Sequence, residues 1–81
     1  MSKTISLFYF AILREQAQRS EEVLETEAED AAELYQELAA KYGFTLEVTQ
    51  VKVAWENTYH SLDLRLKHGM KLAFIPPVAG G

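Results

Sequence analysis

The stretch MKLAFIPPVAGG, residues 70–81, carries the strongest structural signal in the chain. Its apolar half predicts a β-strand over Lys71–Ile75. Pro76 and Pro77 are expected to stop this strand, because proline has no N–H to donate to a sheet ladder and its φ is fixed. Each proline also favours an extended residue before it. We therefore expect the chain to leave the sheet as a stiff thread that reaches at most about 20 Å.

The predicted thread narrows toward its end. Val78-Ala79 is small, and Gly80 and Gly81 have no Cβ and accept backbone conformations that are closed to other residues. Such a thread fits a narrow channel in another protein, where the carboxylate of Gly81 can be modified. Gly-Gly alone is typical of a frayed terminus, but its combination with a strand and Pro-Pro favours a functional end. The sequence thus predicts a domain over residues 1–75 and a flexible, extended tail over residues 76–81.

Composition limits the classes of function. The chain has 81 residues, 48% of them hydrophobic, which suffices for one small domain. It has no cysteine, which excludes disulfides, thiolate metal sites and a cysteine nucleophile. Any sulfur or acyl chemistry would therefore use the C-terminal carboxylate.

The charge pattern bears on partners and location. The net charge is −4 and no Lys/Arg cluster is present, so we expect a basic protein surface as partner and no nucleic acid. Neither a signal peptide nor an apolar run long enough to cross a bilayer is found, so we expect a cytoplasmic protein with no membrane partner.

The first predicted strand is apolar on both faces. Residues 4–10 (TISLFYF) are rich in β-branched and aromatic types. Either this strand is central in the sheet or one of its faces meets a partner, and a central position is favoured. Because strand side chains alternate, Phe8 and Phe10 lie on the face opposite Ile5, Leu7 and Tyr9.

A hairpin is expected next. Residues 11–15 form a helical turn or begin a loop, and residues 16–20 are polar and expected to be exposed loop. Residues 22–26 predict a short strand that pairs antiparallel with the first.

The clearest helix spans residues 31–42. Asp30 and Glu33 fit a capping box, and Gly43 is well placed to end the helix. Its apolar positions recur at three- and four-residue spacing and predict packing on one sheet face: Ala31, Leu34, Tyr35, Leu38 and Tyr42.

The region between this helix and the last strand is less regular. Residues 44–48 are a connection with buried anchors, residues 51–55 predict a strand, residues 56–58 a turn and residues 59–61 a short return strand. Residues 62–66 fit a strand or a helical turn equally well. The order predicts the α+β class: a mixed sheet of four to five strands with one main helix across it. This layout resembles the ubiquitin-like β-grasp, in which the first and last strands are central neighbours.

Two stretches resemble one known family. Residues 5–15 (ISLFYFAILRE) resemble its opening strand and Ala-x-x-Arg-Glu turn, and residues 72–81 (LAFIPPVAGG) resemble its C-terminal motif. The family is the small, sulfur-carrier subunit of molybdopterin synthase. The chain differs from the family pattern at two turn positions: Met70 stands where an acid is usual, and Glu56 where an asparagine is common.

The resemblance implies a two-stage cycle. A ubiquitin-activating-like adenylyltransferase uses ATP to adenylate the Gly81 carboxylate, and sulfur then replaces AMP to leave a thiocarboxylate. The tail enters the large synthase subunit and gives its sulfur to cyclic pyranopterin monophosphate. In such families two carriers flank a dimer of large subunits, which makes a heterotetramer, and the carrier alone catalyses nothing.

Four apolar residues near the tail are candidates for partner binding. One of Phe74 and Ile75 points into the core and the other outward, because neighbours alternate. The outward residue is expected to form a docking patch with Phe8 or Phe10; core positions for all four are an equal alternative. The resemblance favours Phe74 as the contact residue.

Other functions were weighed against this one. His60 and His68 are too isolated to indicate a metal site, so no metal or bound cofactor is expected. A carrier for thiamine or for tRNA or amino-acid thiolation shares the Gly-Gly end, but Pro-Pro favours the molybdopterin carrier. A ubiquitin-like modifier joined to lysines through Gly81 and a plain interaction domain with an inert tail are the remaining alternatives.

Overall fold

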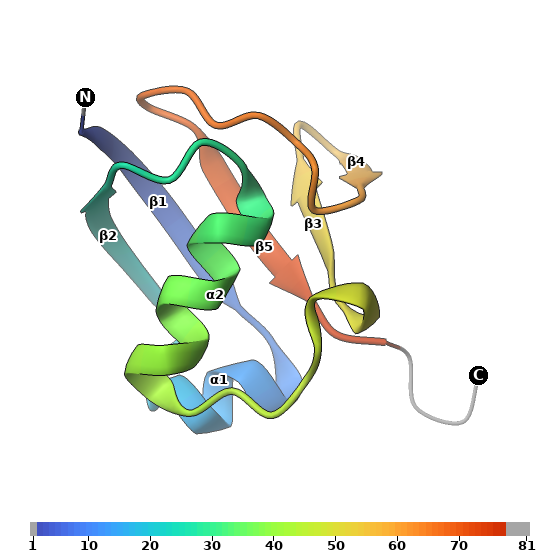
Figure 1. Ribbon diagram of the computed structural model, residues 1–81. Coiled ribbons are helices and arrows are strands. Elements are labelled where there is room, and N and C mark those ends of the chain that lie inside the picture. The colour runs from blue at the N-terminus through green and yellow to red at the C-terminus, as the bar shows by residue number, and fades with distance from the viewer. Residues whose placement is uncertain (1, 78–81) are drawn as a thin grey trace.

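The computed structural model describes residues 2–77. In this part of the chain a five-stranded mixed sheet is crossed on one face by a long helix (Figure 1). The elements in order are β1 (Lys3–Tyr9), α1 (Ala11–Ala17), β2 (Glu21–Thr26), α2 (Ala31–Tyr42), the 3₁₀ turn η1 (Val48–Gln50), β3 (Lys52–Trp55), β4 (Thr58–His60) and β5 (Lys71–Ile75). The predicted α+β class and the mixed sheet are confirmed.

The first and last strands lie side by side at the centre of the sheet. The strand order is β2-β1-β5-β3-β4. β1 runs parallel to β5 and antiparallel to β2, while β5 also pairs antiparallel with β3. The predicted central position of the first strand and its hairpin with β2 are therefore confirmed.

Helix α2 has the predicted limits because both of its ends are capped. The Asp30 carboxylate accepts the N–H of Glu33 at 2.9 Å. The reciprocal bond of the expected capping box is displaced by one residue, since Glu33 accepts from the N–H of Glu29 and not from that of Asp30. Gly43 ends the helix at φ 76°, a conformation that favours glycine.

The loop before β5 completes the N-terminus of α2. The carbonyls of Leu64 and Leu62 accept the N–H groups of Ala31 and Ala32 at 3.0 and 2.8 Å. These are donors that a helix cannot satisfy internally. Residues 62–66 are therefore neither of the two predicted structures: they form a turn with a single bridge, and their leucines serve as anchors.

Helix α1 is longer than the sequence indicated. It continues to Ala17 and ends at Gln18, whose φ is 60°. Leu13 and Ala17 lie four residues apart on one face and are both buried. The prediction of an exposed loop over residues 16–20 was therefore wrong for its first two residues.

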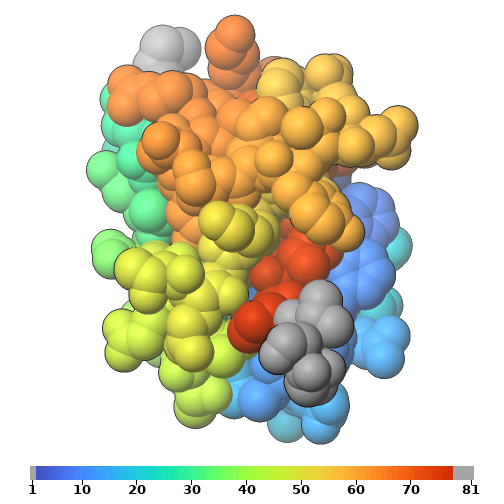
Figure 2. Space-filling view, turned by 90° about the vertical axis from the view of Figure 1, so that its right-hand side faces the viewer, coloured from blue at the N-terminus to red at the C-terminus, as the bar shows by residue number. Residues whose placement is uncertain are grey.

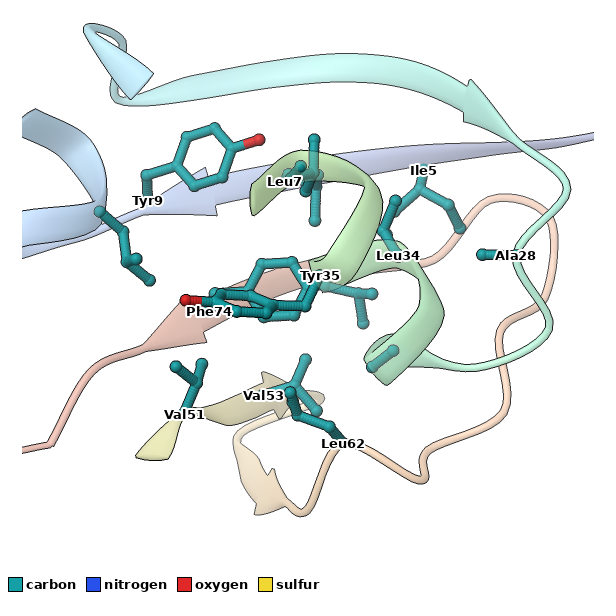
Figure 3. Close-up of a cluster of buried hydrophobic side chains, with 14 of the residues drawn as sticks. Ile5, Leu7, Tyr9, Ala28, Leu34, Tyr35, Val51, Val53, Leu62 and Phe74 are labelled. Carbon is teal, nitrogen blue, oxygen red and sulfur yellow. The ribbon is translucent and has the colours of Figure 1, made fainter. Parts of the chain in front are cut away.

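The core lies between α2 and one face of the sheet (Figure 3). Tyr35 of α2 packs edge-on against Phe74 of β5, with ring centroids 5.4 Å apart, and stacks on Phe44 at 5.5 Å. The Tyr35 hydroxyl donates to the carbonyl of Leu46 at 2.8 Å, so its polar end is satisfied despite burial. Every strand except β4 contributes to this one layer of side chains, and β5 is fixed beneath it.

No helix within residues 2–77 combines the length and apolar character that crossing a bilayer requires.

Candidate functional site at the end of β5

The predicted tail begins at the end of a strand that is held on both sides. Phe74 is paired with Tyr9 of β1 and with Val53 of β3, and Ile75 is paired with Lys52. The ladder stops at Pro76, as its missing N–H requires. Pro76 is half-buried and Pro77 is exposed, so the chain leaves the sheet from a rigid base.

The predicted tail residues Val78, Ala79, Gly80 and Gly81 lie outside the described residues. Their predicted roles as a channel thread and a reactive terminus remain predictions.

Phe74 does not lie on the surface. Its exposed fraction is 0%, and its ring packs against Tyr35 in the core (Figure 3). The prediction that Phe74 is the outward member of the pair was therefore wrong, and Ile75 has that position. Leu72 and Phe74 point toward α2, whereas Ala73 and Ile75 point to the uncovered face.

An apolar rim of exposed side chains surrounds the start of the tail. Phe8 and Phe10 are exposed by 37% and 46%, and Ile75 is partly exposed. Because Tyr9 is opposite Phe74, Phe10 follows at the level of Ile75. Ile12 of α1 is also exposed, by 39%, and was missed because residues 11–15 gave no clear periodicity. We use "apolar rim" for Phe8, Phe10 and Ile75, which the β1–β5 pairing brings together.

Figure 2 shows the red residues of β5 at the surface, between the blue residues of the first strand and the yellow-orange residues of the β3–β4 hairpin. Exposed large apolar side chains gathered near one point are typical of a protein contact. Phe8, Phe10 and Ile75 are thus exposed enough to make such a contact, and their docking role remains a prediction.

A buried carboxylate braces β1 beside the apolar rim. The Glu22 carboxylate of β2 accepts hydrogen bonds from the hydroxyls of Tyr9 at 2.5 Å and Tyr42 at 2.8 Å. It also forms an ion pair with the Arg19 guanidinium at 3.1 Å. The Glu22 side chain is only 7% exposed. These contacts join β1, β2 and the last turn of α2.

The cluster keeps Glu22 charged and the two phenols neutral. Burial raises the pKa of Glu22, but the hydrogen bonds from Tyr9 and Tyr42 and the Arg19 charge outweigh it and hold that pKa below its ordinary value. Burial, and then the hydrogen bond to Glu22, raise the pKa of Tyr9 above its ordinary value. Sequence reasoning missed this cluster, because it joins residues up to 33 positions apart that share no motif.

The described residues give no sign of a metal site. Within residues 2–77, no set of three His, Asp or Glu side chains lies close enough together to hold a metal ion. His68 accepts the N–H of Thr4 through Nδ1 at 3.1 Å, and His60 packs on Trp55. The features near the tail are thus a rigid base, an apolar rim and a polar brace.

The sequence pattern of the ThiS family matches residues 7–81. The chain belongs to the ThiS family. No curated protein matches it.

Solved structures share the ubiquitin-like β-grasp fold of this ThiS-family chain. A putative molybdopterin converting factor, subunit 1, from Pyrococcus furiosus is 27% identical, with 94% of this chain and 99% of that chain covered and a TM-score of 0.73. Small archaeal modifier protein 1 from Methanosarcina acetivorans is 20% identical, with 100% and 99% covered and a TM-score of 0.75. The protein of the same name from Haloferax volcanii is 19% identical, with 96% and 99% covered and a TM-score of 0.73. The predicted β-grasp is confirmed.

Proposed function

We propose that this chain is the sulfur carrier of molybdenum cofactor biosynthesis and acts as the small subunit of molybdopterin synthase. The observation that carries the proposal is the strand end: β5 is paired on both sides up to Phe74 and with β3 up to Ile75, and it is followed by Pro-Pro and, in sequence, by Val-Ala-Gly-Gly. The 27% identity to the Pyrococcus furiosus molybdopterin converting factor supports the same pathway.

The proposed chemistry takes place on the Gly81 carboxylate. A partner adenylyltransferase uses ATP: a carboxylate oxygen attacks the α-phosphorus, pyrophosphate leaves, and an acyl-adenylate forms. A sulfide-equivalent nucleophile then adds to the acyl carbon, and AMP departs with the electron pair of the broken C–O bond. The product is a thiocarboxylate, which provides the sulfur nucleophile that a chain without cysteine otherwise lacks.

The domain's part is to hold the terminus out and to dock. The apolar rim at the tail base would contact first the adenylyltransferase and then the large synthase subunit. Because both partners must use the same tail, they bind one after the other. The donor of sulfur to the pterin precursor is the charged carrier, and hydrolysis of its acyl group returns the Gly81 carboxylate. We place this cycle in the cytoplasm.

Intact-mass spectrometry tests the proposal. Incubation with the adenylyltransferase, ATP and sulfide should raise the mass by about 16 Da, the difference between sulfur and oxygen. The Gly81 deletion and a chain with one alanine added after Gly81 are matched controls that should gain no mass. No gain in the natural chain would contradict the carrier role.

A second measurement separates the pathways. The thiocarboxylated chain, mixed with the large synthase subunit and the pterin precursor, should return to its original mass as the dithiolene product forms. Adducts of higher mass on lysines of other proteins, lost with Gly81, would instead identify a modifier. A charged chain that gives no product here but supports thiamine or tRNA thiolation would assign it to those pathways.

A further inference from the structure

The face of the sheet opposite α2 carries a continuous row of side chains across four strands. The pairings place Phe8 of β1 next to Ala73 of β5, Ala73 next to Ala54 of β3, and Ala54 next to Tyr59 of β4. Cross-strand partners share a face, and the buried neighbours of these residues point toward α2. The row therefore has two alanines in the middle and an aromatic residue at each end.

This arrangement makes a hollow with an apolar floor. A cavity of about 650 Å³ lies over the row, and all four of its residues line it. Alanine side chains are short, whereas Phe8 and Tyr59 carry large rings with exposed fractions of 37% and 70%. Among the described residues, those that line the hollow come from β1, β3, β4, β5 and the β3–β4 turn, and none comes from a helix.

Opposite charges lie side by side at one end of the row. Lys71 precedes Ala73 by two residues on β5, and Glu56 begins the turn that follows β3, two residues after Ala54. Both line the hollow and also an adjoining one of about 510 Å³. Neither Lys71 nor Glu56 makes a salt bridge among the described contacts.

We propose that this face binds the same face of a second copy, about a two-fold axis that runs parallel to the strands between β5 and β3. Such an axis exchanges β5 with β3 and β1 with β4 across the interface. Phe8 of each copy then faces Tyr59 of the other, and Ala73 faces Ala54. The four rings cover the alanine floors, which allow the two sheets to approach closely.

The same axis places side chains of opposite charge against each other. Lys71 of each copy faces Glu56 of the other, so two opposite-charge pairs form per dimer. At the other end of the row Lys52, the partner of Ile75 in the sheet, faces Ile75 of the second copy and meets no like charge. An isologous dimer uses the same surface of both copies, so that surface must be complementary to itself, as this one is. Charge complementarity therefore favours a second copy as the occupant.

The dimer has a consequence for the apolar rim, because Phe8 and Ile75 belong to both surfaces. A partner protein and a second copy cannot occupy them together. The dimer is thus a resting form that dissociates when a partner binds, and it does not depend on the identity of that partner.

Sedimentation equilibrium of the purified chain tests the proposal directly. Samples at about 50 μM and about 2 mM bracket a weak complex with a Kd on the order of 1 mM. We expect the mean mass to rise toward that of a dimer with concentration. Lys71→Glu and Glu56→Lys should each raise the Kd about tenfold, since two attractive pairs become repulsive.

Mixing the two variants gives the decisive measurement. An equimolar mixture restores both opposite-charge pairs in a heterodimer, so association should return to the level of the natural chain. Glu27→Lys, an exposed change of equal charge away from this face, should leave the Kd unchanged.

A monomer at every concentration would overturn the proposal. So would single variants that associate like the natural chain, or a mixture that fails to recover. Amide chemical shifts that change on dilution along α2, and not at Phe8, Ala54, Tyr59 and Ala73, would overturn the assigned face. The sulfur-transfer measurements above are separate, so failure of either proposal leaves the other standing.

Discussion

The two faces of β5 differ although they belong to one short strand. Leu72 and Phe74 are buried beneath α2, while Ala73 and Ile75 lie on the uncovered face, next to Phe8 and Phe10. The covered face holds the strand in place, and the open face is free for contacts. The difference indicates that residues of one strand can contribute very unequally to stability, so the exposed residues should be alterable without loss of the fold.

The largest effect is expected on the covered face. Phe74→Ala should lower the free energy of unfolding by about 3–5 kcal/mol, because a fully buried ring that packs on Tyr35 is replaced by a cavity. Urea denaturation followed by circular dichroism measures it. Ile75→Ala is the matched control and should cost about 1 kcal/mol or less, in proportion to its partial exposure. Equal losses at the two positions would refute the division between the faces.

Neutralising Glu22, the carboxylate of the polar brace, should give the next largest loss in the free energy of unfolding. At pH 7, Glu22→Gln should cost about 1–2 kcal/mol, because a charged acceptor of two tyrosine hydroxyls becomes a neutral one.

This loss is expected to depend on pH. The pKa of Glu22 is lower in the folded than in the unfolded chain, so the unfolded chain binds more protons in the window between the two values. Its contribution is complete above the ordinary value of 4.5 and is lost as the pH falls through the folded value. Urea titrations of the natural chain and of Glu22→Gln, from neutral pH downward, measure the difference between their free energies of unfolding. This difference should shrink as the pH falls through the folded pKa of Glu22. A difference that stays constant with pH would show that the charge of Glu22 is not involved.

Removal of the N-terminal cap of α2 should give the third largest loss in the free energy of unfolding. Asp30→Ala should cost about 1 kcal/mol, because the N–H of Glu33 loses its acceptor. Glu27→Ala removes a nearby exposed carboxylate without a capping role and should leave the denaturation midpoint almost unchanged. A loss of the same size in both variants would indicate a general charge effect.

The open face should give the smallest change in stability. Phe10→Ala is expected to alter the free energy of unfolding by about 0.5 kcal/mol, because nearly half of the side chain is exposed. The same change should weaken binding to the large synthase subunit about tenfold or more if the apolar rim is the docking site. Isothermal titration of the two proteins measures this. Gln36→Ala, an exposed position on α2 and so on the covered side of the sheet, is the control, and equal affinities for both variants would exclude Phe10 from the interface.

Local signals predicted the regular elements well. Asp30 and Gly43 set the limits of α2, and Pro76 set the end of β5, because each acts through the backbone of its own neighbourhood. The central, neighbouring positions of the first and last strands followed from the resemblance to the β-grasp layout.

Features that depend on distant contacts could not be predicted in the same way. Alternation showed that Phe74 and Ile75 face opposite sides, but not which side α2 covers. The brace at Glu22 needs three elements to meet, and the extension of α1 depends on the burial of Ala17. The position of the candidate site along the chain was proposed from the sequence, while the assignment of its residues to the two faces of the sheet required the structure.

The central position of β5 also determines how the domain responds to a mechanical load. If a partner draws the tail into a channel, the force acts along β5. The inter-strand bonds to β1 and β3 lie across that direction on both flanks, so they resist in shear and share the load. An edge strand would peel away one bond at a time. The terminus can thus be pulled tight without unravelling the domain behind it.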